Sequence, residues 1–130
     1  MPIPHRQMFR AMVHRVAVTE CDVEYEGSLT LDPELMRAAD MLPYERIEVY
    51  DVDNGARFAT YLIEGDPGSG DCCVNGAAAR LVERGHKLIV ATYTTVDDEQ
   101  ARDWQPTVVL VGEGNRIKSV KSNETARTRV

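Results

Sequence analysis

Apolar and polar residues alternate along several short stretches of the chain. Residues 14–20 place both of their valines on one face of an extended segment, and residues 28–31 do the same with two leucines. This alternation is typical of a strand with one buried face. Stretches rich in β-branched and aromatic residues predict further strands at 46–52, 56–64, 72–74, 86–96, 107–111 and 116–120.

Turn residues separate these predicted strands. Asn54-Gly55 stands between two β-rich stretches and predicts a hairpin. Residues 112–115 have similar chemistry and predict a final hairpin, whereas residues 65–71, with their glycines and a proline, predict a loop. Frequent turns between short strands favour a small β barrel or a compact β sandwich.

A few short helices are also predicted. Asp32-Pro33 has the chemistry of a helix start, an acidic N-cap followed by proline, and this helix is expected to end near 41–43. Residues 75–85 predict a second short helix that ends at a glycine. Residues 97–104 predict one or two helical turns.

Length and composition suit one globular domain. The chain has 130 residues, of which 43% are hydrophobic, enough for a core of its own. Residues 1–130 are therefore expected to form a single mainly β domain with short helices, and the polar residues 122–130 to form a flexible tail. A chain of this size also has room to complete a site by oligomerisation.

Charge and residue usage exclude several classes of function. A net charge of −6 disfavours a nucleic-acid binder, which needs a basic surface to displace phosphate counterions. No apolar stretch approaches a membrane span of about 18 residues, and no signal-peptide pattern is present, so a cytoplasmic protein is expected. The three cysteines and three histidines lack the spacing of a disulfide framework or a metal site, and we predict reduced thiols and no metal.

The pair Gly27-Ser28 stands at the start of a predicted strand and has two interpretations. The first is an ordinary turn, which local sequence favours here as it does for Gly68-Ser69. The second is self-cleavage, in which the serine hydroxyl attacks the preceding carbonyl, the peptide becomes an ester, and elimination and hydrolysis leave a pyruvoyl group at residue 28. Such a ketone would form a Schiff base with an amino acid and act as the electron sink for decarboxylation. We expect glycine at 27 to help because it adopts conformations that other residues resist.

Five segments place this pair in a wider pattern. They are HRVAVT at 14–19, YEGS at 25–28, NGARFATY at 54–61, VNGAAA at 74–79 and DEQARDWQP at 98–106. In this order and at these separations they resemble the pyruvoyl-dependent aspartate 1-decarboxylase family over almost the whole chain.

The resemblance implies a fold, an assembly and a reaction. It implies a double-psi β-barrel and a homotetramer with active sites at subunit interfaces. It also implies self-cleavage into a β chain, residues 1–27, and an α chain, residues 28–130, that begins with the pyruvoyl group. The family reaction converts L-aspartate to β-alanine and carbon dioxide, on the route to pantothenate and coenzyme A.

Several site residues follow from the resemblance by position. Ser28 matches the pyruvoyl precursor, and Tyr61 matches the proton donor to the carbon that lost its carboxylate. Thr60 matches a residue that assists processing, and Arg57 matches the arginine that binds a substrate carboxylate. Without the resemblance these would be ordinary strand residues and a solvated charge.

A second group is expected around the substrate. Asn75 and the backbone amides of Gly76 and Ala77 stand at a predicted helix start, where they could hold an oxyanion or a carboxylate. Simple N-capping by Asn75 is the alternative, and both roles are compatible. Tyr25, near the cleavage point, and Tyr50, at an aromatic pocket position of the family, are expected to contact the substrate.

Met12 departs from the family pattern. A lysine commonly lies two residues before the HRV segment, so this chain lacks a cation that helps to neutralise the substrate. Arg10 could compensate if it lies on the same strand face, two residues upstream. Alternatively, the chain is a paralogue that acts on a longer, alkylated or less charged amino acid. A third alternative is an uncleaved barrel that binds a small acid or a partner subunit, and cleavage itself could be spontaneous or need a helper protein.

Overall fold

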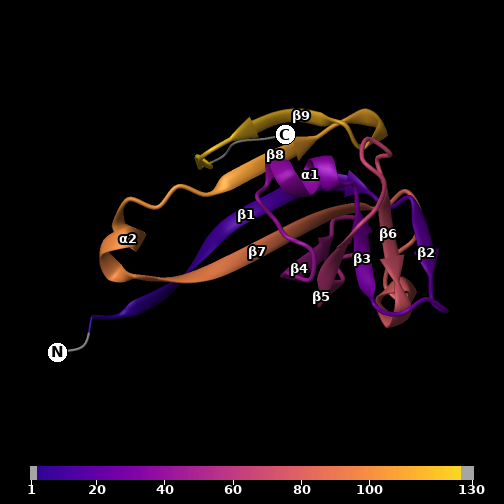
Figure 1. Ribbon diagram of the computed structural model, residues 1–130, viewed down its shortest axis with the longest axis horizontal. Helices are drawn as coiled ribbons and strands as arrows, with labels where there is room; N and C mark the ends of the chain where they lie inside the picture. Colours follow the sequence, from indigo (N-terminus) through magenta and orange to yellow (C-terminus); the bar gives the residue numbers. More distant parts are fainter. Residues whose placement is uncertain (1–2, 127–130) are drawn as a thin grey trace.

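The computed structural model describes residues 3–126, which form one mixed sheet with a few short helices (Figure 1). The sheet order is β2-β6-β3-β5-β4-β7-β1-β8-β9. The strands are β1 (His5–Ala17), β2 (Glu20–Asp22), β3 (Ser28–Leu31), β4 (Arg46–Asp51), β5 (Arg57–Glu64), β6 (Cys72–Asn75), β7 (Lys87–Asp97), β8 (Thr107–Val111) and β9 (Ile117–Lys121). The helices are α1 (Pro33–Ala38) and α2 (Asp98–Arg102), with 3-10 turns η1 (Gly76–Arg80) and η2 (Glu113–Asn115).

The architecture confirms the mainly β prediction. Three neighbouring pairs are parallel, β2 with β6, β3 with β5 and β1 with β8, and the other pairs are antiparallel. This mixed pairing with few short helices agrees with a double-psi β-barrel. In Figure 1 the long strands β1 and β7 run from the end that carries α2 to the end that carries β2, β3 and β6. None of the helices within residues 3–126 is long and apolar enough to cross a membrane.

Strand β1 is longer than its pattern predicts. It begins at His5, nine residues before the predicted start, because it pairs along its length with β7. A bulge between Phe9 and Ala11 breaks the alternation of this stretch, which hid the strand from a periodicity argument. A second shift follows between His14 and Val16.

The helices follow their local signals in part. Asp32 caps α1 and accepts a hydrogen bond from the Glu34 amide at 2.9 Å, as predicted. The helix ends at Ala38. Asp40, two residues later, has φ +54°, and Met41 N–H donates a hydrogen bond to the Met36 carbonyl at 2.8 Å. The predicted helix at 75–85 is wrong: only a 3-10 turn, Gly76–Arg80, forms there.

Two buried polar side chains tie the loops to the barrel. Asp32 also accepts from the amides of Gly68 and Gly70, at 3.1 and 2.9 Å, so the turn at Gly68-Ser69 is structural, as predicted. Burial acts to raise the pKa of the Asp32 carboxyl, but the hydrogen bonds from these backbone amides hold that pKa below its usual value. Asn115 bonds the backbone of Ala17 and Gly70 at 2.8 Å.

The predicted tail is only partly described. Residues 122–126 are exposed and follow the end of β9, and residues 127–130 lie outside the described part. The flexibility of the tail stays a prediction.

Candidate active site

Ser28 is buried in a strained conformation at the first position of β3. Its exposed fraction is 1% and its φ is +120°, a value that side chains other than glycine rarely adopt. β3 lies between β6 and β5, and Ser28 itself is paired with Asn75 of β6. The expected role of Gly27 is wrong in one respect. A Cβ atom at Gly27 would meet nothing within 4 Å and its φ is not left-handed, so the strained backbone is that of the serine.

Hydrogen bonds orient both partners of the Gly27-Ser28 bond. The Tyr61 hydroxyl donates to the Gly27 carbonyl at 3.3 Å, and Asn75 Nδ2 donates to Ser28 Oγ at 3.2 Å. Asn75 Nδ2 also donates to Thr30 Oγ1 at 3.0 Å, which fixes the amide. Within residues 3–126 no carboxylate or imidazole bonds Ser28 Oγ. The geometry therefore orients the hydroxyl and polarises the carbonyl without a direct general base.

Gly76 allows the polypeptide after β6 to approach the Gly27-Ser28 segment. Its φ is +70°, and a Cβ atom there would lie 2.9 Å from Gly27 Cα and 3.3 Å from the Tyr25 carbonyl oxygen. A side chain at this position would therefore displace the segment. The N-capping alternative for Asn75 is wrong, because its side chain makes no cap hydrogen bond to η1 and bonds Ser28 instead.

A cavity of about 430 Å³ opens beside the Gly27-Ser28 bond. It is lined by Tyr25, Glu26, Gly27, Ser28, Pro43, Tyr44, Tyr61, Ile63 and Glu64. Four predicted residues, Tyr25, Gly27, Ser28 and Tyr61, are therefore brought together. Ala77 is exposed on η1 and does not line the cavity. Thr60 pairs with the buried Ile47 on the opposite face of β5 and makes no side-chain hydrogen bond within the described residues. Its role in processing stays a prediction.

Arg57 and Tyr50 form a second group away from this cavity. The Arg57 guanidinium lies 3.9 Å from the centroid of the Tyr50 ring, a cation–π contact. Tyr50 Oη and Tyr93 Oη share a hydrogen bond of 2.9 Å, which together with burial raises the pKa of Tyr93 to about 12. Arg57 precedes Tyr61 by four residues on β5, about 13 Å along a strand. One chain does not bring the two groups to one cavity. The sequence analysis missed Tyr93, which only the strand register places beside Tyr50.

Met12 lies on the same sheet face as Arg57 and Tyr50. It is half-buried and is paired in register with Ala91 of β7, which is in turn paired with Glu48 of β4. Tyr50 and Arg57 are paired two residues further along β4 and β5. Alternation therefore places these side chains on one face of the sheet.

The proposed compensation by Arg10 is wrong. Its Nη2 lies 2.7 Å from Glu45 Oε2, and the same oxygen accepts from Thr92 Oγ1 at 2.7 Å. Thr92 follows Ala91 on β7 and therefore faces the side opposite to Met12. The bulge after Phe9 breaks the alternation on which the prediction depended.

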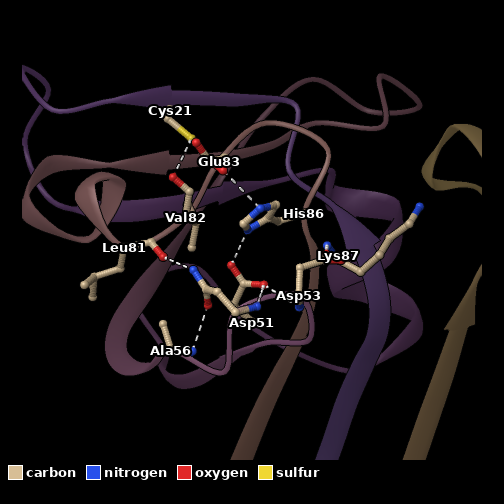
Figure 2. Close-up of polar contacts among 10 residues, drawn as sticks. Cys21, Asp51, Asp53, Ala56, Leu81, Val82, Glu83, His86 and Lys87 are labelled. Carbon is tan, nitrogen blue, oxygen red and sulfur yellow. Dashed lines mark hydrogen bonds and ion pairs between the residues drawn. The ribbon is translucent and has the colours of Figure 1, made fainter.

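A side-chain cluster at the β4–β5 turn supports the hairpin that carries Arg57 (Figure 2). The Asp51 carboxylate, with a fully buried side chain, lies 2.7 Å from His86 Nδ1 and accepts from the Asp53 amide at 2.8 Å. Glu83 Oε2 lies 3.4 Å from His86 Nε2. The hydrogen bond to Asp51 raises the pKa of His86. Ligand atoms of Asp51, Asp53 and His86 lie within 4.8 Å of one another, a grouping that sequence spacing did not predict.

Comparison with known proteins identifies the family of this chain. The family described as aspartate decarboxylase matches residues 4–118. The chain is 50% identical over 117 residues to the aspartate 1-decarboxylase of Ralstonia nicotianae, which covers 90% of this chain and 98% of the relative. It is 52% identical over 113 residues to that of Syntrophus aciditrophicus, covering 87% and 97%, and 46% identical over 117 residues to that of Legionella pneumophila, covering 90% and 88%. The chain therefore belongs to the aspartate decarboxylase family.

Proposed function

We propose that this protein is a pyruvoyl-dependent aspartate 1-decarboxylase that cleaves its own Gly27-Ser28 bond. The observation that carries the proposal is the buried Ser28 at φ +120°, with its hydroxyl held by Asn75 and the adjacent Gly27 carbonyl bonded by Tyr61. A strained peptide, an oriented nucleophile and a polarised carbonyl are the elements that an intramolecular acyl shift requires.

The covalent steps balance without an external oxidant. Ser28 Oγ bonds the Gly27 carbonyl carbon while the C–N bond breaks, which gives an ester and a free amino group at residue 28. Loss of the α proton expels the Gly27 carboxylate and leaves a dehydroalanine. One water then replaces the nitrogen, which leaves as ammonia, and the new α chain begins with a ketone.

The residues around this bond fit the ketone. The pyruvoyl carbonyl supplies the electron sink for decarboxylation of an amino acid. Asn75 lies within hydrogen-bond reach of the position of Ser28, and Gly76 has no side chain that would displace residue 27. Tyr61 lines the same cavity and carries a phenol hydroxyl, the group that its proposed role as proton donor to the substrate carbon requires.

We further propose a homotetramer in which two copies complete each site. Arg57, Tyr50 and Met12 do not line the cavity at Ser28, and Arg57 lies about 13 Å along β5 from Tyr61, which does line it. Binding of an acidic substrate next to Ser28 therefore needs the Arg57 face of a second copy. Three free cysteines accord with a reducing compartment, and we propose the cytoplasm.

L-aspartate is the proposed substrate, and the site retains one predicted cation for it. Arg10 is paired with Glu45 and Met12 is uncharged, so Arg57 holds a substrate carboxylate. Met12 also supports a second candidate function, that of a paralogue that decarboxylates a longer or less charged amino acid. A half-buried methionine offers an apolar surface to such a side chain.

A product assay tests the activity. Purified protein, with its cleavage state known, is incubated with L-aspartate and with amino acids of other side chains, and β-alanine or the corresponding amine is quantified. We expect β-alanine from L-aspartate, no product from Ser28→Ala, and faster aspartate turnover by Met12→Lys. A cleaved protein that releases no β-alanine contradicts the aspartate assignment, and an amine from another amino acid favours the paralogue. The purified chain is also incubated with and without cell extract. Cleavage without extract shows that no maturation factor is needed, and cleavage only with extract shows that one is needed.

A further inference from the structure

Tyr44 combines two features that are unusual for a tyrosine. It lies between α1 and β4 with φ +70°, a left-handed conformation that glycine and asparagine adopt with less strain. Its side chain is 78% exposed, so burial does not offset this strain. Stability of the fold therefore does not account for a tyrosine at this position.

Neighbouring contacts impose the conformation on the Tyr44 backbone. Its N–H donates to the Leu62 carbonyl at 2.7 Å, and Leu62 N–H donates to the Glu45 carbonyl at 3.1 Å. The Glu45 carboxylate is held by Arg10 and Thr92, each at 2.7 Å. These bonds use the backbone and Glu45, so the turn does not require the Tyr44 side chain.

The ring of Tyr44 lies next to the ring of Tyr61. The two centroids are 6.4 Å apart and the planes are inclined by 31°. Both rings line the cavity that contains Gly27 and Ser28. Tyr61 is 38% exposed and its bond to the Gly27 carbonyl is long, at 3.3 Å, so its phenol depends on neighbours for a fixed direction. Within residues 3–126, Tyr44 is the aromatic residue whose ring contacts the ring of Tyr61.

We propose that Tyr44 is a positioning residue that holds the phenol of Tyr61 against the Gly27-Ser28 position. The left-handed backbone places the ring at the rim of the cavity beside Tyr61, which accounts for a tyrosine at this position. The kinetic part of this inference rests on the proposed decarboxylase activity, in which Tyr61 donates the proton. Tyr44 acts through Tyr61 and does not itself donate it.

The test compares Tyr44→Asn with Tyr44→Phe. Asparagine keeps the left-handed turn without the ring, whereas phenylalanine keeps the ring. We expect Tyr44→Asn to lower kcat for L-aspartate about tenfold with a smaller change in KM, because orientation of the donor is lost. It should also raise Tm by about 3 °C at equal protomer concentration, because the strain is relieved. Tyr44→Phe should restore most of the kcat.

Asp40→Gly is the matched control. Asp40 is another left-handed residue of the same connection, with φ +54°, and it does not line the cavity. Glycine there should raise Tm without lowering kcat. A loss of kcat in Asp40→Gly equal to that in Tyr44→Asn would attribute the effect to the altered connection and overturn the inference.

Two further measurements complete the test. In a Tyr61→Phe background, Tyr44→Asn should produce no further loss of kcat, because the two residues act as one unit; an equal loss in both backgrounds overturns the inference. Nitration of Tyr61 by tetranitromethane, mapped by mass spectrometry, should be several-fold faster in Tyr44→Asn than in Tyr44→Phe. If the wild type does not decarboxylate aspartate, the proposed function fails, and equal nitration rates would then overturn the positioning role separately.

Discussion

The strain at Ser28 gives a prediction that does not depend on catalysis. Ser28→Gly and Ser28→Ala both remove the hydroxyl, so neither variant can cleave itself. They differ in the backbone: glycine adopts φ +120° freely, whereas alanine retains the strain of the serine. We therefore expect Ser28→Gly to be more stable than Ser28→Ala, the reverse of the usual order in a strand.

The magnitude follows from two opposing terms. A residue other than glycine in such a region is destabilised by about 1–3 kcal/mol. Glycine in an ordinary strand is less favourable than alanine by about 0.5–1 kcal/mol. Ser28→Gly should therefore be more stable than Ser28→Ala by about 1 kcal/mol, which corresponds to about 4 °C in Tm for a domain of this size.

Thermal unfolding of the two uncleaved variants, at equal protomer concentration, measures this difference. The control is the pair Thr30→Gly and Thr30→Ala on the same strand in the Ser28→Ala background, since Thr30 has no positive φ. There alanine should be the more stable. A Ser28→Ala protein as stable as Ser28→Gly would refute the claim that the backbone of residue 28 is strained.

Three other variants test the surroundings of the site. Asn75→Ala should slow cleavage of the Gly27-Ser28 bond about tenfold, followed by intact mass against time, because Ser28 Oγ loses its donor; an unchanged rate would contradict the orienting role. Gly76→Ala should lower Tm by several degrees, since its Cβ would lie 2.9 Å from Gly27 Cα at φ +70°. The raised pKa of His86 means that its contribution to stability is present below the unfolded pKa of about 6.5 and is lost as pH rises through the folded value. The unfolding free energy lost in His86→Gln should therefore be larger at pH 5.5 than at pH 9, and a loss independent of pH would contradict the ion pair with Asp51.

Features specified by neighbouring residues were predictable from the sequence. The hairpin at Asn54-Gly55 and the cap at Asp32 depend on turn and capping chemistry within a few residues, and both form where expected. Ser28 and Tyr61 share the cavity as the family pattern implied. The pattern alone did not show that the strain lies in Ser28 and not in Gly27.

Features that depend on register or on distant partners were missed. Because of the bulge after Phe9, Arg10 does not lie on the sheet face of Met12. The alternation of apolar and polar residues does not predict this bulge. The contact of Asp51 with His86 joins residues 35 positions apart, so no local signal could reveal it. The left-handed Tyr44 is likewise imposed by bonds to β5 and not by its own sequence.

Intact mass spectrometry of the purified protein tests the central claim most directly. The account predicts two fragments, one that ends at Gly27 and one that begins at residue 28 with a pyruvoyl group in place of serine, and a single uncleaved chain for Ser28→Ala. Reduction with borohydride should add two hydrogens to the larger fragment, as expected for a ketone. A wild-type chain that stays uncleaved, both alone and after incubation with cell extract, would contradict the account.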